Sequence, residues 1–404
     1  MKILIISHKP PYPPVDGGTI ATLNMCLGLA KVGHEVTLLS TTTLKHPGEV
    51  GQIPAEIRSL MHIEYQHIDL QTDLRNGALN FLFSRRPYNI ERYIKSSFKH
   101  LIYRYLSTEQ YDIVQLEGLY LVPYIDTIRK HHQGPIALRA HNVENNIWLS
   151  LANEERNRYK RRYFQLLHRR LMRMETGLNS SIDALVAISE PDRQWFESHG
   201  LTKPSITMPM GYFSKATPAS EQQAQPATSF AYIGALDWIP NYEGLMWFIH
   251  RAWPHIQAQE PDAEFHIAGR NAQASLAEQL LTERKIIFHG QVPSATDYLN
   301  NYPIMVVPLQ SGSGIRVKIV EGMFMGRAIV CTSSAIMGID VRHEQHVLIA
   351  DTPEEFANHV VTLMRNTELR EKLARNAQEF ATKHYDAVRL AQSLTEFYQS
   401  LPQQ

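Results

Sequence analysis

Cysteine is scarce in this chain. The 404 residues include two, Cys26 and Cys331, which lie far apart and are each flanked by apolar residues. Two thiols cannot form a zinc site by themselves. We therefore interpret both as small core residues of a protein from a reducing compartment.

Net charge and long apolar runs are also lacking. Lys+Arg and Asp+Glu number 40 each, a balance that argues against a dedicated nucleic-acid-binding protein. No run approaches the roughly 18 apolar residues of a membrane-spanning helix. The first residues, MKILIIS, have the pattern of a strand rather than of a signal peptide. We expect a cytoplasmic protein.

Two common motifs of nucleotide enzymes are missing. The loop after the first apolar segment does not carry G-x-G-x-x-G, which gives little support to a Rossmann oxidoreductase. Neither an Asp-x-Asp motif nor a compelling cluster of acidic residues occurs. We therefore expect no bound metal ion and no resident cofactor.

The most informative stretch present is 304–332, IMVVPLQSGSGIRVKIVEGMFMGRAIVCT. Its apolar runs 304–307 and 328–330 are short and β-branched, as in parallel strands that are buried on both faces. Between them, Gly312 and Gly314 precede a helical pattern. Glycines let the backbone approach a ligand, and a helix N-terminus presents free N–H groups and partial positive charge. This loop suits a phosphate group.

Three charged residues follow these glycines. Arg316 and Lys318 add two cations at the helix start, and Glu321 lies three residues after Lys318. A carboxylate about one turn from a diphosphate is well placed to accept hydrogen bonds from ribose hydroxyls. The alternative is a solvated helix start with an i,i+3 charge pair. The pattern favours a nucleotide-diphosphate site.

The chain length favours two domains. Apolar strand patterns alternate with helical patterns in both halves, which is typical of parallel, doubly wound α/β sheets. A segment rich in Ala, Pro, Gln, Ser and Thr separates the halves. The predicted parts are a first domain at 1–213, a linker at 214–229, a second domain at 230–384 and a last helix at 385–404 that can pack back on the first domain.

Polar residues follow several predicted strands of the first half. Ligands of doubly wound sheets lie at the carboxyl ends of strands. Glu117 and His141 occupy such ends, and the first loop ends in Asp16, Gly17 and Gly18. A glycine pair most often makes a tight turn, and a single histidine is usually structural. His141 is flanked by charged and polar residues, which makes it a candidate site residue.

The second half has comparable loops. Strand-to-helix loops carry Asp237, Arg270, Val292 and the segment 311–316. Since all of them follow strands of one predicted parallel sheet, we expect these loops to gather along a single edge.

Residues 154–178 have the pattern of one long basic helix. Eight Lys and Arg residues fall between Arg156 and Arg173 and are interleaved with aromatic and leucine residues. One interpretation is a solvated amphipathic helix. The other is a basic surface that meets anionic lipid headgroups at the inner face of the cell membrane.

These features together resemble the GT-B glycosyltransferases, and the phosphate loop resembles that of glycosyltransferase family 4, a large retaining group. The resemblance implies two Rossmann-like, doubly wound parallel-sheet domains facing a cleft. It covers most of the chain and includes the G-x-L-D-x-x-x-N loop at 234–241. The matching positions of the phosphate motif are Pro308, Gly312, Gly314, Lys318, Glu321, Gly326 and 328–330.

The resemblance implies a role for each candidate. Lys318 and Arg316 would neutralise the leaving diphosphate, and Glu321 would hold the ribose. His141 would lie over the donor sugar and stabilise the transition state. Apart from the resemblance, we expect Asp16 or Glu117 to orient the acceptor hydroxyl. The remaining donor-binding positions would be Gly17, Gly18, Asp237, Asn241, Arg270, Val292, Ser313 and Gly314.

This sequence departs from the family pattern in three places. Ser313 stands where the family usually has a glutamate, so a carboxylate contact to the donor sugar is lost. Ala235 and Pro240 stand where the donor loop often has Arg and Lys. Arg316, two residues before Lys318, is an extra cation that compensates for them.

The implied activity is retaining transfer of a sugar from a nucleotide-diphosphate donor. The acceptor would be a hydroxyl of a glycan or lipid-linked molecule in envelope polysaccharide synthesis. Two alternatives are a GT-B-fold nucleotide-sugar epimerase and a non-catalytic nucleotide-sugar-binding protein.

Overall fold

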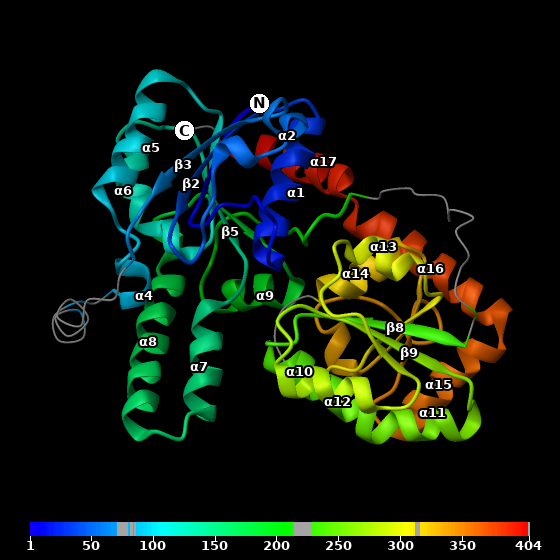
Figure 1. The fold of residues 1–404 in the computed structure, drawn as a ribbon. Helices are drawn as coiled ribbons and strands as arrows, with labels where there is room; N and C mark the ends of the chain where they lie inside the picture. The colour runs from blue at the N-terminus through cyan, green and yellow to red at the C-terminus, as the bar shows by residue number, and fades with distance from the viewer. Residues whose placement is uncertain are drawn as a thin grey trace. The chain divides into compact units, whose positions relative to one another are not determined.

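The computed structural model describes residues 1–70, 80, 84, 86–213, 226, 228–311 and 316–402. The chain forms two compact units (Figure 1): unit 1 is Met1–Gly211 with Ala387–Gln404, and unit 2 is Tyr212–Asp386. Most of the predicted linker lies outside the described residues, and β8 already begins at Ser229.

Unit 1 is a parallel α/β unit. Its described residues form seven strands in the order β3-β2-β1-β4-β5-β6-β7, all paired in parallel. Its elements are β1 Lys2–Ser7, α1 Gly17–Lys31, β2 Glu35–Thr42, η1 Val50–Gln52, α2 Ala55–Arg58, β3 His62–His67, α4 Tyr88–Glu91, α5 Ser96–Thr108, β4 Ile113–Glu117, η2 Leu119–Tyr124, α6 Ile125–Arg129, β5 Ile136–Ala140, α7 Glu144–Glu154, α8 Arg158–Thr176, η3 Leu178–Ser180, β6 Ala184–Ala187, α9 Glu190–Ser198, β7 Ser205–Thr207 and α17 Ala387–Gln399.

The central strand β1 is buried on both faces. Ile3 and Ile5 belong to a core shared with α1 and α17. Leu4 and Ile6 belong to the opposite core, shared with α5, α6 and α8. Because successive side chains point to opposite faces of a strand, a strand covered on both sides must be apolar throughout. This explains the continuous apolar run at the start of the sequence.

Unit 2 has the same architecture. Its described residues form six strands in the order β10-β9-β8-β11-β12-β13, again all parallel. Its elements are β8 Ser229–Ile233, α10 Ile239–Trp247, the π-helix η4 Phe248–Ala252, α11 Trp253–Gln259, β9 Glu264–Ala268, α12 Ala274–Thr282, β10 Ile286–Phe288, α13 Ala295–Asn300, β11 Ile304–Val307, α14 Val317–Phe324, β12 Ala328–Cys331, η5 Ser333–Ile336, β13 Leu348–Ile349, α15 Pro353–Arg365 and α16 Thr367–Tyr385.

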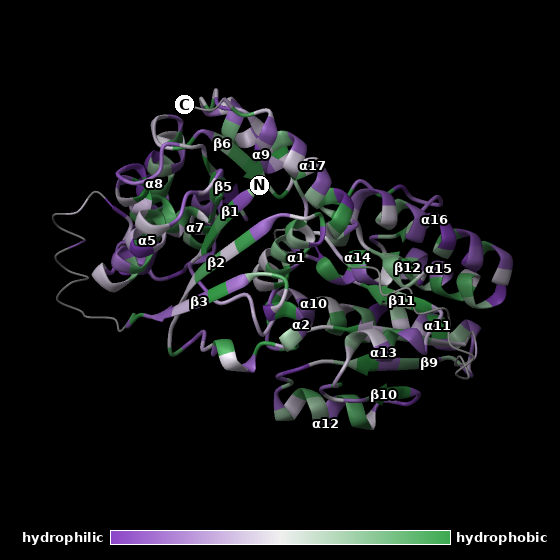
Figure 2. Ribbon diagram, turned by 90° about the horizontal axis from the view of Figure 1, so that it is seen from above, coloured by the Kyte–Doolittle hydropathy of each residue, from purple (hydrophilic) through white to green (hydrophobic). Residues whose placement is uncertain are grey.

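Strand β8 divides the core of unit 2 as β1 does in unit 1. Phe230 and Tyr232 pack with α10, α11 and α15. Ala231 packs on the other face with α14 and α16. Figure 2 shows the consequence, since the strands are largely hydrophobic while helices such as α15 and α16 alternate between hydrophobic and hydrophilic residues. The predicted class of two doubly wound α/β units is confirmed.

The last helix, α17, packs on α1 within unit 1. The two helices are tightly packed at Gly28, where an added Cβ would lie 2.6 Å from the backbone oxygen of Ala387. His34 Nε2 and the Thr395 hydroxyl, 2.7 Å apart, add a polar contact between the end of α1 and α17.

Several predicted element bounds were wrong. The long helix predicted over 154–178 is present as α8, but it begins at Arg158, because Glu154 is the last residue of a separate helix, α7. Asn157 separates them, since its side chain accepts hydrogen bonds from the backbone N–H groups of Tyr159 and Lys160 and so caps α8. The helical segment after β8 begins at Ile239 and continues through a π-helical turn to Gln259.

Each sheet has one topological switch point, where successive connections leave in opposite directions. In unit 1 it lies between β1 and β4, and in unit 2 between β8 and β11. Ligands of open α/β sheets bind at the carboxyl ends of the strands beside such a point. The loops after Ser7, Glu117, Ile233 and Val307 are therefore the positions to inspect.

Candidate functional site

Lys318 is the centre of a polar cluster at the switch point of unit 2. It lies in the first turn of α14, and its Nζ donates a hydrogen bond of 2.9 Å to Oδ1 of Asn241. The same ammonium group lies 4.7 Å from the ring centroid of Tyr232, within the range of a cation–π interaction. Two predicted site residues are thus brought together by the start of α10 and the start of α14.

Gly234 makes room for this cluster. A Cβ at this position would lie 2.8 Å from Lys318 Nζ and 2.9 Å from Asn241 Nδ2. Any larger residue would push the ammonium group away. Asn241 is held in turn, since its Nδ2 donates to the backbone oxygen of Ala235 at 2.8 Å.

Arg316 adds a second cation to the N-terminus of α14. It is the N-cap residue of the helix and is 6% exposed. Its guanidinium lies 5.4 Å from the ring centroid of Trp238, which belongs to the loop after β8. The aromatic face therefore helps to fix the side chain of Arg316 close to Lys318.

Burial shifts the pKa values of the charged side chains at this helix start, in the direction that a bound anion would reverse for the cations. Burial, reinforced by the nearby charge of Arg316, lowers the pKa of Lys318 to about 7. Burial also raises the pKa of Glu321 to about 7, although Lys318 acts in the opposite direction. Burial lowers the pKa of Arg316 as well. A bound dianion would stabilise both cations and reverse the shift of Lys318.

The neighbouring loops of unit 2 are linked by backbone hydrogen bonds. Leu236 N–H donates to the oxygen of Arg270 at 2.9 Å, and Gly269 N–H donates to the oxygen of Gly290 at 2.8 Å. Asp237 is exposed and accepts a 3.0 Å hydrogen bond from Asn271 Nδ2. The loops after β8, β9 and β10 therefore form one continuous edge, as expected from the sequence.

The remaining donor-site predictions of unit 2 are less well defined. Val292 is half-buried against the core formed with α14 and α16. Ser313 and Gly314 lie outside the described residues.

Glu117 and His141 meet at the switch point of unit 1. Glu117 ends β4 and is 1% exposed, and its Oε2 lies 2.7 Å from His141 Nε2. Because an ionised carboxylate only accepts, the Nε2–H of His141 must donate. Oε2 also receives hydrogen bonds from Thr22 at 3.0 Å and Arg139 at 3.3 Å. His141, by contrast, keeps a side-chain exposure of 16%.

This carboxylate is firmly ionised. Burial acts to raise the pKa of Glu117, but the charge of Arg139 and the hydrogen bond from His141 outweigh it and hold the pKa at about 2. A further hydrogen bond comes from Gln115, which itself accepts one from the hydroxyl of Tyr398 in α17. All these partners belong to unit 1, and they fix the tautomer and orientation of His141.

Asp16 has a structural task in unit 1. Its carboxylate accepts two hydrogen bonds from Lys9 Nζ, at 2.7 and 2.8 Å, and one from the backbone N–H of Thr19 at 2.9 Å. It therefore caps α1 and holds Lys9. Gly17 and Gly18 form the first turn of α1, and a Cβ at Gly18 would lie 3.2 Å from Lys9 Nζ.

Several residues of these clusters were not predicted. His8 follows β1, and its Nδ1–H donates a 3.0 Å hydrogen bond to the backbone oxygen of Glu117. Tyr232 and Trp238 support the two cations of α14. A histidine after the first strand was a usable signal for His8. The contacts of Tyr232 and Trp238 depend on tertiary structure and leave no signal in the local sequence.

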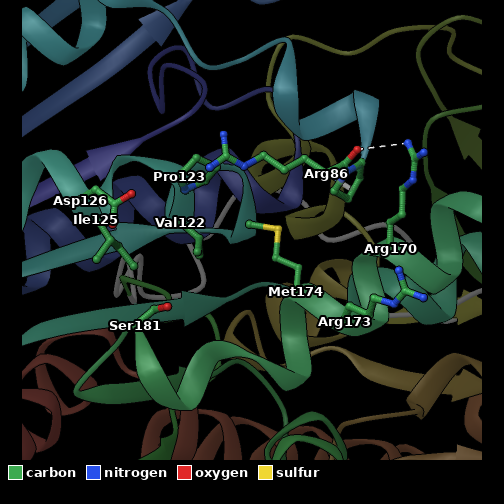
Figure 3. A pocket seen from close by; sticks show the side chains of 10 residues that line it. Arg86, Val122, Pro123, Ile125, Asp126, Arg170, Arg173, Met174 and Ser181 are labelled. Carbon is green, nitrogen blue, oxygen red and sulfur yellow. Dashed lines mark hydrogen bonds between the residues drawn. The ribbon is translucent and has the colours of Figure 1, made fainter. Parts of the chain in front are cut away.

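A separate cavity of unit 1, about 680 Å³ in volume, contains none of the predicted site residues. Figure 3 shows the side chains of Arg86, Arg170 and Arg173 around it, with Arg170 donating to the backbone oxygen of Arg86 at 3.2 Å. Within the described ranges, no three His, Cys, Asp or Glu side chains gather in a way that could hold a metal ion.

The chain matches two family profiles. One, described as "Glycosyltransferase Family 4", matches residues 15–211, and the other, described as "Glycosyl transferases group 1", matches residues 227–366. An uncharacterized 44.6 kDa protein in the cps region of Klebsiella pneumoniae is 24% identical to this chain. The match covers 97% of this chain and 98% of that protein.

Solved structures resemble the whole chain. The complex of HepE from Anabaena with UDP has a TM-score of 0.66 and 14% identity, over 99% of this chain and 100% of that one. Sucrose-phosphate synthase from Thermosynechococcus elongatus has a TM-score of 0.66 and 16% identity, over 99% of this chain and 98% of that one. At these identities the likeness shows a shared fold.

The resemblance inferred from the sequence is therefore confirmed. Both units carry parallel sheets of the GT-B type. The two family profiles together match most of the chain. The chain belongs to the group 1 glycosyltransferases.

Proposed function

We propose that the chain transfers a sugar, with retention of anomeric configuration, from a nucleotide-diphosphate donor to a hydroxyl of a glycan or lipid-linked acceptor in envelope polysaccharide synthesis. The observation that carries this proposal is the cluster at the start of α14. Lys318 contacts Asn241 and Tyr232, and the absence of a side chain at Gly234 leaves room for its ammonium group. Arg316 lies beside it at the N-cap of α14.

The cluster suits the leaving group of such a reaction. When the bond between the anomeric carbon and the β-phosphate oxygen breaks, negative charge develops on the diphosphate. Lys318, Arg316 and the N–H groups of the helix start would stabilise this charge where it develops. The acceptor oxygen bonds to the anomeric carbon, and its proton can pass to the departing diphosphate. These protein cations take the role that a metal ion has in other transferases, so no metal is required.

The donor contacts follow from the same placement. Glu321 would accept hydrogen bonds from the ribose hydroxyls, and the loops that carry Asp237 and Arg270 would line the donor. Backbone groups near Val292 would meet the base. Ser313 and Gly314 would offer backbone N–H groups to the donor.

In unit 1 we propose that His141 acts on the donor sugar and that Glu117 positions it. Glu117 is buried and its carboxylate is engaged by Thr22 and Arg139 as well as His141. This placement favours a positioning role over the acceptor contact predicted from the sequence.

The comparisons supply a first donor to test. Structures of HepE contain UDP and UDP-glucose, so we propose a UDP-sugar as the donor of this chain. The relative from Klebsiella pneumoniae lies in a cps region, which supports a polysaccharide or its lipid-linked precursor as acceptor.

We further propose that the hairpin of α7 and α8 contacts an anionic membrane surface. Figure 1 shows these helices side by side in unit 1. Arg158, Arg161 and Arg162 line a recess of about 580 Å³ near the turn. Apolar groups lie nearby, with Leu149 38% exposed and Tyr159 72% exposed. No helix in the described part of the chain is long and apolar enough to span a membrane.

Co-sedimentation with vesicles tests the membrane contact. Binding to vesicles with anionic lipid at low salt, with little binding to neutral vesicles, is expected, since each basic residue near such a surface contributes about 1 kcal/mol. Changing Arg158, Arg161 and Arg162 to Gln should abolish the preference for anionic over neutral vesicles. If this variant binds anionic vesicles as strongly as the native protein does, the hairpin is rejected as the contact.

Incubation with UDP-glucose alone tests the transfer proposal against its alternatives. Slow hydrolysis that first releases α-glucose, followed by ¹H NMR, is the expected result for a retaining transferase. An altered sugar still attached to UDP would identify an epimerase. Binding of UDP without any turnover, even with glycan acceptors present, would identify a binding protein. A thermal-shift screen of UDP, GDP and dTDP selects the base, since a bound nucleotide stabilises the native state.

A further inference from the structure

Unit 1 contains a further cavity, next to the cluster of His141 and Glu117. Its volume is about 650 Å³, within the range of about 300–1,000 Å³ that is typical of small-molecule sites. His8 lines the cavity and also donates to the backbone oxygen of Glu117. The cavity is thus connected to the candidate catalytic histidine through two contacts within one unit.

Aromatic rings form much of the cavity wall. Tyr120 stacks on His8 with ring centroids 4.8 Å apart, and Tyr93 meets Tyr120 edge-on at 5.2 Å. Such faces suit the C–H groups of a sugar ring, while tyrosine hydroxyls offer hydrogen bonds at the edge. The aromatic residues that line the cavity are Tyr88, Tyr93, Tyr120, Trp148 and Tyr163.

The charges of the wall are predominantly positive. Lys9, Lys45 and Arg92 line it, against one carboxylate, Asp69, among the described lining residues. Lys9 is held in place by Asp16, which gives Asp16 an indirect part in this site. Since Lys9 is paired with Asp16, the excess of positive charge over Asp69 comes from Lys45 and Arg92, and it favours an anionic ligand over a neutral sugar.

Two polar side chains of the wall are incompletely satisfied. The Nε of Arg92 and both amide atoms of Asn89 are buried, and they make no hydrogen bond of normal geometry within the described residues. Buried polar atoms without partners cost free energy. A ligand that carries acceptor oxygens, especially charged ones, would satisfy Arg92 with a strong hydrogen bond.

We propose that this cavity binds a saccharide bearing a carboxylate or phosphate group, and that this saccharide is the acceptor. The proposal rests on the proposed transfer function and names the substrate class of its acceptor side. The sugar ring packs on the tyrosines, the anion meets Arg92 and Lys9, and a free hydroxyl is directed to the end of the cavity at His8.

Titrations of three sugars followed by saturation-transfer NMR test the proposal, with the donor site filled by UDP. The probes are methyl β-D-glucuronide, glucose 6-phosphate and the neutral methyl β-D-glucoside. At least one charged probe should bind about tenfold or more tightly than the neutral one, as expected for a charge-assisted hydrogen bond. Arg92→Met should remove this preference, and Asn89→Ala should weaken it.

Arg156→Met is the matched control, because Arg156 is an exposed arginine of the same unit that does not line the cavity. The control should keep the preference for the charged probe. Equal affinity for charged and neutral probes, absence of binding by all three, or a preference that survives in Arg92→Met would overturn the proposal. UDP binding and UDP-glucose hydrolysis by the unaltered protein are measured separately, so failure of the transfer function is distinguishable from failure of the cavity.

Discussion

Lys318 donates a hydrogen bond of 2.9 Å to Asn241 although the two residues lie 77 positions apart. The contact joins the first turn of α10, which follows β8, to the first turn of α14, which follows β11. Strands β8 and β11 flank the switch point of unit 2. The contact positions an ammonium group whose pKa is lowered by burial. A bound diphosphate would raise that pKa again.

Nucleotide binding should therefore take up protons. The pKa of Lys318 is lowered to about 7 in the free protein, so the side chain is mostly neutral at pH 8 and must regain its proton beside a diphosphate. UDP affinity should fall by up to about tenfold per pH unit between about pH 8 and 9, where Glu321, with a pKa of about 7, is already ionised in the free protein. Calorimetry in two buffers of different ionisation enthalpy measures the uptake. Lys318→Met should show none, and pH-independent affinity of the native protein would contradict the assignment.

Glu321 should discriminate between nucleotides with and without ribose hydroxyls. Replacing it by Ala removes a charged acceptor, which typically costs about 1.5–3 kcal/mol of binding. The expected result is a loss of about tenfold or more in UDP affinity and little change for 2′,3′-dideoxy-UDP. Glu243→Ala, an exposed position on α10, serves as the control. Equal losses for both nucleotides would exclude the ribose contact.

Glu117→Gln should destabilise unit 1 strongly. The change leaves the buried guanidinium of Arg139 without its counter-ion, and breaking a buried pair costs about 3–5 kcal/mol. Chemical denaturation measures the loss, with Glu109→Gln as control because its ion pair with Lys2 is partly exposed and worth about 0–1 kcal/mol.

Acid should reproduce this loss in the native protein. The pKa of Glu117 is depressed to about 2, so its contribution to stability is complete above its ordinary, unfolded value. The contribution declines as the pH falls from there towards about 2. A Glu117→Gln variant as stable as the native protein at neutral pH would show that the carboxylate does not support the fold.

Gly28→Ala should loosen the C-terminal helix. An added Cβ would lie 2.6 Å from the oxygen of Ala387, and overpacking of this kind costs about 1–3 kcal/mol. This exceeds the gain of about 1 kcal/mol that alanine brings to a helix interior. Gly51→Ala is the control, since nothing lies within 4 Å of a Cβ there. A variant with an unchanged Tm would contradict the close packing of α1 and α17.

The strands that carry the site were predictable because their sequences are short apolar runs. Val114, Leu138 and Val306 are buried within strands whose two faces are both covered by helices, and polar residues appear as soon as such strands end. The positions of Glu117, His141 and Lys318 at strand and helix ends could therefore be inferred from the chain alone.

What each residue contacts could not be inferred in the same way. An acidic residue after a strand has the same local pattern whether it meets a ligand or a buried partner. The usable signal for Glu117 was Arg139, a cation inside the apolar strand β5 that is 0% exposed and so requires a carboxylate nearby. The start of α8 was placed too early because Asn157 lies within a basic, helix-favouring sequence and caps the helix through its side chain.

The rate of UDP release from UDP-glucose, compared between the native protein and Lys318→Ala, tests the central claim most directly. Lys372→Ala, an exposed lysine of unit 2, is the matched control. Loss of a group that stabilises developing charge lowers turnover by about 10²-fold or more, so Lys318→Ala should fall by at least that factor while Lys372→Ala stays near the native rate. A near-native rate for Lys318→Ala would contradict the proposal that the start of α14 is the leaving-group site.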